Sequence, residues 1–202
     1  MKVLVVYYSL YGHVLQLAQA VAAGVKSVAG VEAVLRRVQE FPEVEQEMSQ
    51  HPHALEVWNR QKDIPVCTLD DLKAADGILF GSPTRYGNMI AQMKRLIDAT
   101  VTIWFDFEGK PAGVFTSSAS THGGQETTCF TMMAPLLHLG LIIVGVPYST
   151  PGMLHNEGRG GTPYGASTIA GQKNELKPTK EDLAIAQAQG RRVAEIAKKL
   201  RG

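Results

Sequence analysis

Five short segments with strand character, each separated from the next by a helical pattern, constrain the fold of this chain most strongly. The first segment, KVLVVYYS, has no alternation of polar and apolar residues, which is typical of a strand buried on both faces of a parallel sheet. Strands that alternate with helices predict an α/β fold in which helices cover both faces of the sheet. The five strand segments are residues 2–9, 30–38, 77–82, 110–118 and 141–147.

The helical patterns between and after these strands set the order of the sheet. Right-handed crossovers between five parallel strands favour the order 2-1-3-4-5, the flavodoxin-like arrangement, in a three-layer, doubly wound five-stranded sheet. Pro135 lies inside one helical pattern and predicts a kink there, and Thr179 with Asp182 predicts a capping box at the start of the last helix. The predicted helices cover residues 12–28, 68–76, 89–100, 125–140 and 178–202.

Two long segments fit neither pattern. Residues 39–68 are polar, mix both charge signs and contain three prolines. They are too long for an ordinary connection and are interpreted as an insertion after the second strand, with one short helix. Residues 148–171 are rich in glycine and are predicted to form a long loop before the last helix. We expect residues 1–202 to form a single domain, because this length is typical of one α/β unit.

Composition narrows the possible functions. The net charge of +1 comes from well-mixed residues without a basic stripe, which argues against a nucleic-acid-binding surface. Cys67 and Cys129 lack CxxC spacing, so they indicate free thiols in a reducing compartment. With no signal peptide and no apolar run of about 18 residues, we expect a cytoplasmic protein without membrane insertion. His51 and His53 have no third ligand at a sensible spacing, so no metal site is predicted.

The segment SLYGHV, residues 9–14, follows the first strand and opens the first helix. Free backbone N–H groups and the helix dipole favour an anion at such a place, and Gly12 permits a close approach of the backbone. The loop contains no Lys or Arg and matches neither GxGxxG nor the phosphate-binding motif of nucleotide triphosphatases. It therefore fits a phosphate monoester better, although the same residues also fit an ordinary turn in which Ser9 caps the helix.

Two further loops, SPTRYGNM and TSSASTHGGQE, follow the third and fourth strands, and parallel strands bring their carboxyl ends to the same edge of the sheet. The amides of Thr84, Arg85 and Tyr86, beside Gly87, suit the polar edge of a flat heteroaromatic ring. The second loop supplies a wall rich in hydroxyl groups and glycine. Each loop alone also fits a simple turn. Three such loops at neighbouring strand ends favour a heteroaromatic ligand that carries one phosphate.

Four motifs, YYSLYGHV, GSPTRYGNM, THGGQETT and RGGTPYGASTIAG, resemble the WrbA family of flavodoxin-like NAD(P)H:quinone oxidoreductases that bind FMN. The resemblance runs from Val3 to the last helix, with no fixed pattern over residues 41–68. It implies FMN-dependent two-electron reduction of quinones by NADH or NADPH, in a ping-pong cycle through one flavin-facing cavity. It also implies a homotetramer, in which we expect residues 152–168 to pack over a neighbouring flavin site.

The resemblance implies roles for individual residues. Tyr11 matches the position that contacts the nicotinamide cofactor. The candidate catalytic residues are His138, which matches a family histidine near the flavin, and Trp104, which matches an aromatic residue over the substrate cavity. The residues implied to bind FMN are Ser9, Leu10, Tyr11, Gly12, His13, Val14, Pro83, Thr84, Arg85, Tyr86, Gly87, Asn88, Ser117, Ser118, Ala119, Ser120, Thr121, His122, Gly123 and His138.

Two alternative functions stay open on the sequence alone, a flavodoxin-type electron carrier and a non-enzymatic FMN-binding accessory protein. Carriers usually present an acidic face to their redox partners, whereas this chain is nearly neutral, which disfavours the first alternative. A phosphoacceptor receiver domain on the same fold is excluded, because VLVVYYS offers no carboxylate cluster around the first strand.

Overall fold

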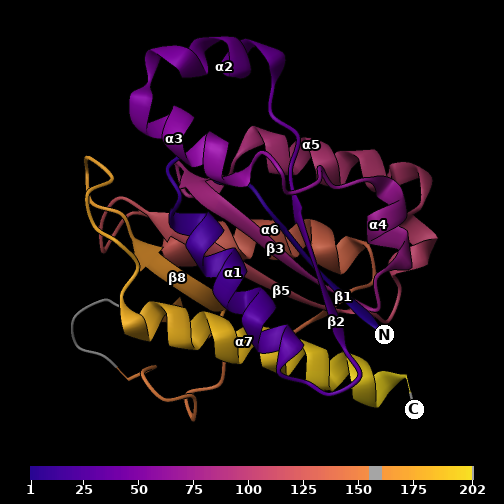
Figure 1. The fold of residues 1–202 in the computed structure, drawn as a ribbon. Coiled ribbons are helices and arrows are strands. Elements are labelled where there is room, and N and C mark those ends of the chain that lie inside the picture. The colour runs from indigo at the N-terminus through magenta and orange to yellow at the C-terminus, as the bar shows by residue number, and fades with distance from the viewer. Residues whose placement is uncertain (155–160, 202) are drawn as a thin grey trace.

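A computed structural model describes residues 1–154 and 161–201 (Figure 1). The strands within these residues are β1 (Lys2–Tyr7), β2 (Glu32–Arg37), β3 (Gly77–Arg85), β4 (Asn88–Met89), β5 (Pro111–Ser118), β6 (Ile142–Ile143), β7 (Gly161–Thr162) and β8 (Gly165–Ile169). The helices are α1 (His13–Lys26), α2 (Pro42–Glu47), α3 (Pro52–Gln61), α4 (Leu69–Ala74), α5 (Ala91–Ala99), α6 (Gln125–His138) and α7 (Lys180–Leu200). Three short 3₁₀ turns are η1 (Met48–Gln50), η2 (Thr100–Thr102) and η3 (Trp104–Phe107).

The strands form one sheet with the order β2-β1-β3-β5-β8-β7. The pairs β1–β2, β1–β3, β3–β5 and β5–β8 are parallel, and β7 pairs antiparallel with β8 at the edge. The predicted flavodoxin-like fold and the positions of its first four strands are therefore confirmed. Because these strands are parallel, their carboxyl ends lie at one edge of the sheet, where the loops of interest begin.

The fifth strand position differs from the prediction over residues 141–147. Only Ile142–Ile143 form β6, which pairs with the start of β5, and β8 continues along the rest of β5. The prediction of an uninterrupted loop over residues 148–171 is therefore wrong for β7 and β8. A reason lies at Gly165, where a Cβ would stand 2.0 Å from the carbonyl oxygen of Val114, so only glycine admits this close pairing.

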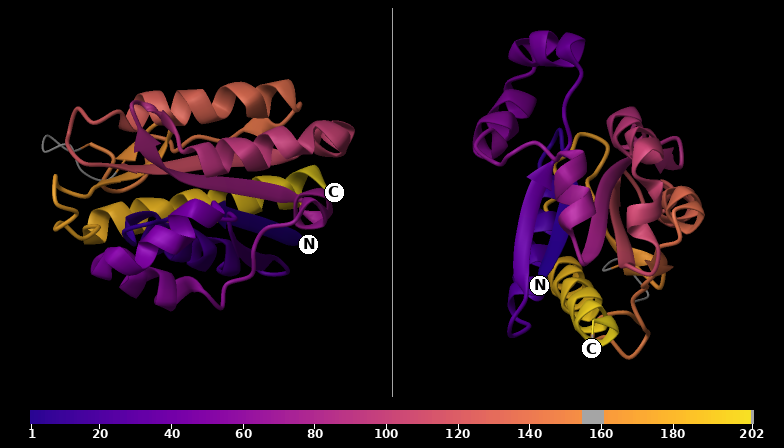
Figure 2. Two further views of the ribbon diagram at one scale, coloured as in Figure 1. Left: turned by 90° about the horizontal axis from the view of Figure 1, so that it is seen from above. Right: turned by 90° about the vertical axis from the view of Figure 1, so that its right-hand side faces the viewer.

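Helices cover both faces of the sheet (Figure 2). On one face α1 and α7 pack side by side over a core that includes the fully buried Tyr7 and Phe115. On the other face α4, α5 and α6 enclose a second core around Ile78 and Met132. Within the described residues, none of the helices combines the length and the apolar character needed to cross a membrane.

The insertion after β2 contains more helix than predicted. It forms α2, η1 and α3 rather than one short helix, and it projects beyond the sheet near the carboxyl end of β1 (Figure 1). A proline opens each of its two helices, where a missing backbone N–H has no cost, so Pro42 and Pro52 mark the helix starts within this polar segment.

The local signals at the other helix ends agree with the structure. The Thr179 hydroxyl accepts a hydrogen bond from the backbone N–H of Asp182, and the Asp182 carboxylate accepts one in return from the backbone N–H of Thr179. Pro135 lies inside α6, one turn before its end, and the backbone leaves the helix at Gly140 with a positive φ of 75°.

Two glycines set the closest contact between α1 and α7. A Cβ at Gly24 would lie 1.9 Å from the carbonyl oxygen of Gln187, and one at Gly190 would lie 2.1 Å from that of Val21. Both obstructions are backbone atoms, so no side-chain rotation can relieve them. The two helices therefore touch backbone to backbone, which fixes how closely α7 lies beside α1.

This contact predicts the effect of a single methyl group. Gly190→Ala gains about 1 kcal/mol of helix propensity. The added methyl group must also push α1 and α7 apart, and we expect this separation to destabilise the protein by more than the gain in propensity. The free energy of unfolding should fall by about 1–3 kcal/mol net, measured by chemical denaturation. Ala184→Ser, at an exposed position of α7, is the control and should change it by less than about 0.5 kcal/mol. A more stable Gly190→Ala variant would contradict the close contact.

Candidate functional site

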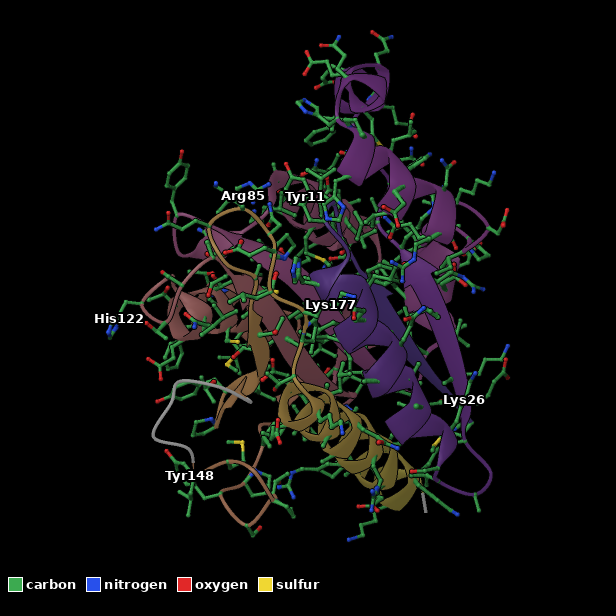
Figure 3. All side chains as sticks on the ribbon, turned by 60° about the vertical axis from the view of Figure 1, so that its left-hand side comes forward. Tyr11, Lys26, Arg85, His122, Tyr148 and Lys177 are labelled. Carbon is green, nitrogen blue, oxygen red and sulfur yellow. The ribbon has the colours of Figure 1, made fainter. Side chains whose placement is uncertain are left out.

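The three loops predicted from the sequence meet at the carboxyl edge of the sheet. They follow β1, β3 and β5 and surround a cavity of about 130 Å³. Arg85 and Tyr11 lie at this end of the molecule, as Figure 3 shows. The described residues that line the cavity are Ser9, Leu10, Tyr11, His13, Val14, Pro83, Thr84, Arg85, Ser117, Ser118, Ala119, Ala170 and Asn174.

The first loop presents unpaired backbone donors. Gly12, the residue before α1, has a positive φ of 89°, and its N–H donates to the Ser9 hydroxyl at 3.1 Å. Within the described part of the chain, the backbone N–H groups of Leu10 and Tyr11 have no hydrogen-bond acceptor. The first turn of α1 adds further free N–H groups and carries no acidic residue. This loop is therefore suited to an anion.

His13 joins the first loop to the segment after β8. Its Nε2 lies 2.7 Å from the carbonyl oxygen of Leu176, and since a carbonyl only accepts, Nε2 carries the proton and donates. Burial of the ring, opposed by this hydrogen bond, keeps the pKa of His13 below its usual value. The neighbouring His53 lowers the pKa further. The ring is thus fixed as a neutral donor that closes one side of the cavity.

A buried carboxylate lies behind the first loop. Glu40, only 2% exposed, accepts hydrogen bonds from the Tyr8 hydroxyl at 2.5 Å, from Nε2 of Gln92 at 2.5 Å and from the backbone N–H of Phe41 at 2.9 Å. Burial and the bond to Glu40 raise the pKa of Tyr8, so its hydroxyl remains a donor. The carboxylate ties the end of β1 to α5, which follows the second loop.

The second loop is a tight hairpin at the end of β3. Thr84 pairs with Met89 and Arg85 with Asn88, so Tyr86 and Gly87 are the two turn residues. Both have positive φ, 53° and 76°, as a type I′ turn requires. The Tyr86 ring is fully exposed.

The hairpin is held from inside by Thr84. Its hydroxyl oxygen accepts from the backbone N–H of Gly87 at 3.1 Å and from the Thr128 hydroxyl at 2.8 Å. Thr128 lies in the first turn of α6, so the hairpin is fixed to the helix that follows the third loop. The cavity side of the hairpin consists of Pro83, Thr84 and Arg85.

The third loop folds back on itself. The carbonyl oxygen of Ser120 accepts from the Ser118 hydroxyl at 2.8 Å, from the backbone N–H of Gly123 at 3.0 Å and from Nε2 of Gln125 at 3.1 Å. As a result Ser117, Ser118 and Ala119 face the cavity and the rest of the loop does not.

Part of the third loop borders a different space. Thr121 and His122 line a second cavity of about 470 Å³ beside the start of α6, together with Met153 and Ser167 among the described residues. His122 points outward in Figure 3. In the same way Tyr86 and Asn88 line an open groove beside α5 rather than the first cavity.

The structure does not bring His138 and Trp104 to the cavity of their own chain. His138 ends α6 and Trp104 begins η3 after α5, and both helices run back from the carboxyl edge of the sheet. The two side chains therefore lie at the opposite edge, both exposed. The resemblance implies that both residues act beside the flavin, and neither lines the cavity of its own chain, so their catalytic role stays a prediction.

Sequence reasoning missed Ala170 and Asn174, which complete the wall beside His13. Both follow β8, whose backbone the sequence analysis interpreted as loop. Had residues 165–169 been recognised as a strand, the rule that ligands lie at carboxyl strand ends would have indicated these positions.

The chemistry of the cavity fits a phosphorylated flavin. Its described lining holds the basic Arg85, the hydrogen-bond donor His13 and no acidic side chain. Free amides with a left-handed glycine suit the phosphate, and the two hydroxyl-bearing walls flank the space beyond it. In the described residues no group of three or more His, Cys, Asp or Glu side chains could hold a metal ion.

Comparison with known proteins agrees with this geometry. Residues 1–151 match the family model described as NADPH-dependent FMN reductase. Curated proteins named NAD(P)H dehydrogenase (quinone) are similar over their whole length, covering 100% of both chains. The protein from Geobacter sulfurreducens is 53% identical over 207 residues, and that from Geobacter metallireducens is 51% identical over 205 residues.

Solved structures also show that the fold is flavodoxin-like. The flavodoxin, WrbA-like protein from Agrobacterium tumefaciens superposes with a TM-score of 0.66 at 25% identity, covering 98% of both chains. A flavodoxin from the domain Archaea superposes with a TM-score of 0.62 at 22% identity over 100% of both chains. From its full-length relatives and its matched family model, this chain belongs to the NAD(P)H dehydrogenase (quinone) family of flavodoxin-like FMN reductases.

Proposed function

We propose that this chain is an FMN-dependent NAD(P)H dehydrogenase that reduces quinones. The observation that supports the proposal most directly is the cavity at the carboxyl edge, with unpaired amides on one wall, the basic Arg85 and no acidic side chain in its described lining. The curated relatives that carry the corresponding name are about half identical over the entire chain.

The residues of the chain divide the binding of FMN between them. The free N–H groups of Leu10 and Tyr11, with the first turn of α1, would hold the phosphate. The Thr84–Arg85 side of the hairpin and the Ser117–Ala119 side of the third loop would flank the ring. Bound FMN would supply the redox chemistry, a two-electron transfer from NADH or NADPH to a quinone. Tyr11, half-buried in the lining of the cavity, would contact the nicotinamide.

A spectroscopic experiment tests this function and separates it from an electron carrier. Purified protein with FMN should lose its flavin absorption when NADH or NADPH is added without oxygen, and benzoquinone should restore it. Under steady-state conditions NAD(P)H oxidation should continue without any added reductase. Apoprotein stripped of FMN is the control and should be inactive. Reduction that occurs only with a separate reductase would identify a carrier instead.

We also propose that the protein is a homotetramer, because an apolar surface surrounds the displaced catalytic candidates. Val101, Trp104, Phe105 and Leu137 are exposed by 72%, 47%, 73% and 60%. The two segments that carry them adjoin, since the backbone N–H of Gly109 donates to Gly140 at 3.0 Å. Packing of this surface against another copy would bury it and carry His138 and Trp104 to a neighbouring flavin.

Residues 152–168 would contribute to the same assembly, and positions 155–160 of this segment lie outside the described residues. We propose a cytoplasmic location, which the unpaired thiols Cys67 and Cys129 support. Burial raises the pKa of each thiol to about 12, so neither is poised to react.

The assembly makes a prediction about one surface residue. Phe105→Asp should lower the mass measured by light scattering from a tetramer of 21.9 kDa chains to a smaller species, because a charge cannot be buried in an apolar interface. Quinone turnover should fall with it. Lys94→Asp, at an exposed position of α5, is the control and should leave the mass unchanged. A monomeric wild-type protein with FMN bound would contradict the proposal.

The same arrangement predicts the effect of removing the displaced histidine. His138→Ala should reduce quinone turnover about tenfold or more while the protein remains tetrameric, since a positioned donor typically contributes a factor of this size or larger. Steady-state kinetics with benzoquinone measure the effect. Turnover equal to that of the wild-type protein would remove His138 from the mechanism.

A further inference from the structure

Helix α3 of the insertion contacts the phosphate-binding loop from behind, although its sequence gave no reason to expect a role there. The Tyr11 and His53 rings are stacked with centroids 6.0 Å apart and an angle of 8°. A Cβ at Gly12 would lie 3.3 Å from the Val57 side chain, which is buried. These contacts place the inner face of α3 directly against the loop.

One side chain of α3 makes directed hydrogen bonds to the loop and to the strand before it. Gln61 is 4% exposed, and both ends of its amide are used. Its Nε2 donates to the carbonyl oxygen of Ser9 at 2.7 Å, and its Oε1 accepts from the Tyr7 hydroxyl at 3.1 Å. Burial raises the pKa of Tyr7, so that hydroxyl remains a donor. The Tyr7 hydroxyl thereby fixes which end of the amide faces Ser9.

The hydrogen bond to Ser9 sets the direction of the next donor. A trans peptide is planar, with its C=O and N–H pointing in opposite directions. Because Gln61 holds the carbonyl of Ser9 toward the insertion, the N–H of Leu10 in the same peptide points away from it. Leu10 lines the cavity, and its N–H has no acceptor in the described part of the chain.

Contacts with β2 hold the insertion in place against the first loop. The Arg37 guanidinium stacks on the Trp58 ring at 4.7 Å, and its Nε donates to the carbonyl oxygen of Ile64 at 3.0 Å. The backbone N–H of Arg37 also donates to Pro65, at 3.0 Å. Helix α3 is thus fixed to β2 at its end, next to Gln61.

We propose that Gln61 is a positioning residue for the flavin phosphate, which acts by fixing the Ser9–Leu10 peptide so that its N–H faces the phosphate. The inference rests on the proposed binding of FMN. This role of Gln61 gives the insertion after β2 a function in cofactor selectivity. Only ligands that carry the phosphate gain affinity from the fixed Ser9–Leu10 peptide.

The experiment compares the affinity of the apoprotein for FMN and for riboflavin, which lacks the phosphate, by quenching of flavin fluorescence. Gln61→Leu removes the donor while keeping a similar volume. We expect its affinity for FMN to fall about tenfold and its affinity for riboflavin to change by less than about threefold. Gln61→Glu, which keeps an acceptor for Tyr7 but loses the donor to Ser9, should behave like Gln61→Leu.

Gln189→Leu is the matched control. Gln189 is also buried, and both ends of its amide are likewise used, here on the backbone, with Nε2 donating to the carbonyl oxygen of Val114 at 2.9 Å and Oε1 accepting from the N–H of Ala166 at 3.0 Å. It lies on α7, away from the first loop. The variant should lower the melting temperature and leave the ratio of FMN to riboflavin affinity unchanged.

The outcomes separate the two proposals. A wild-type protein that binds neither flavin overturns the proposed function itself. A wild-type protein that binds FMN, with Gln61→Leu showing the same affinity ratio, overturns the role of Gln61 alone. If Gln61→Leu does not fold, Tyr7→Phe decides, because it frees the Gln61 amide without removing it. This variant should reduce the ratio of FMN affinity to riboflavin affinity about threefold, and an unchanged ratio would overturn the inference.

Discussion

The unpaired backbone donors between β1 and α1 are the feature on which the rest of the site depends. Parallel pairing of β1 with β2 and β3 buries the strand, and the left-handed Gly12 turns the chain into α1, so that the free N–H groups of the loop and of the first helical turn lie next to one another in the chain. Those groups need an anion, and the other two loops leave space for a flat ring beside it. Cofactor binding therefore follows from how one strand ends and one helix begins.

Much of the fold and of the candidate site could be predicted from the sequence, because the sequence patterns that specify them are local. The apolar run of β1, the glycine at position 12 and the Tyr86–Gly87 turn each specify a backbone conformation within a few residues. The contribution of β8 could not be seen in this way. Its segment GASTI is short, and its strand conformation depends on Gly165 approaching the backbone of β5 closely, which is a tertiary requirement. Ala170 and Asn174 were missed for the same reason.

The insertion after β2 shows more clearly which site residues cannot be predicted from the sequence. Gln61 stands in the polar run NRQKD, where it has the composition of a solvated surface, yet it is buried against Ser9 and Tyr7. Only the packing of α3 on the first loop reveals that Gln61 contacts the site. His138 and Trp104 pose the opposite case. Motif resemblance predicts a catalytic role for them, but the topology places both at the far edge of the sheet, so a role at the flavin would require the proposed second copy of the chain.

The central claim is that backbone N–H groups of the first loop hold the phosphate of the cofactor. Amide resonances of Leu10, Tyr11, His13 and Val14 measure it directly, in NMR spectra of the apoprotein titrated with FMN and, separately, with riboflavin. The account predicts large downfield proton shifts of these amides with FMN and small ones with riboflavin, because a hydrogen bond to a charged oxygen deshields the proton. Equal shifts with both flavins, or none in this loop with FMN, would contradict it.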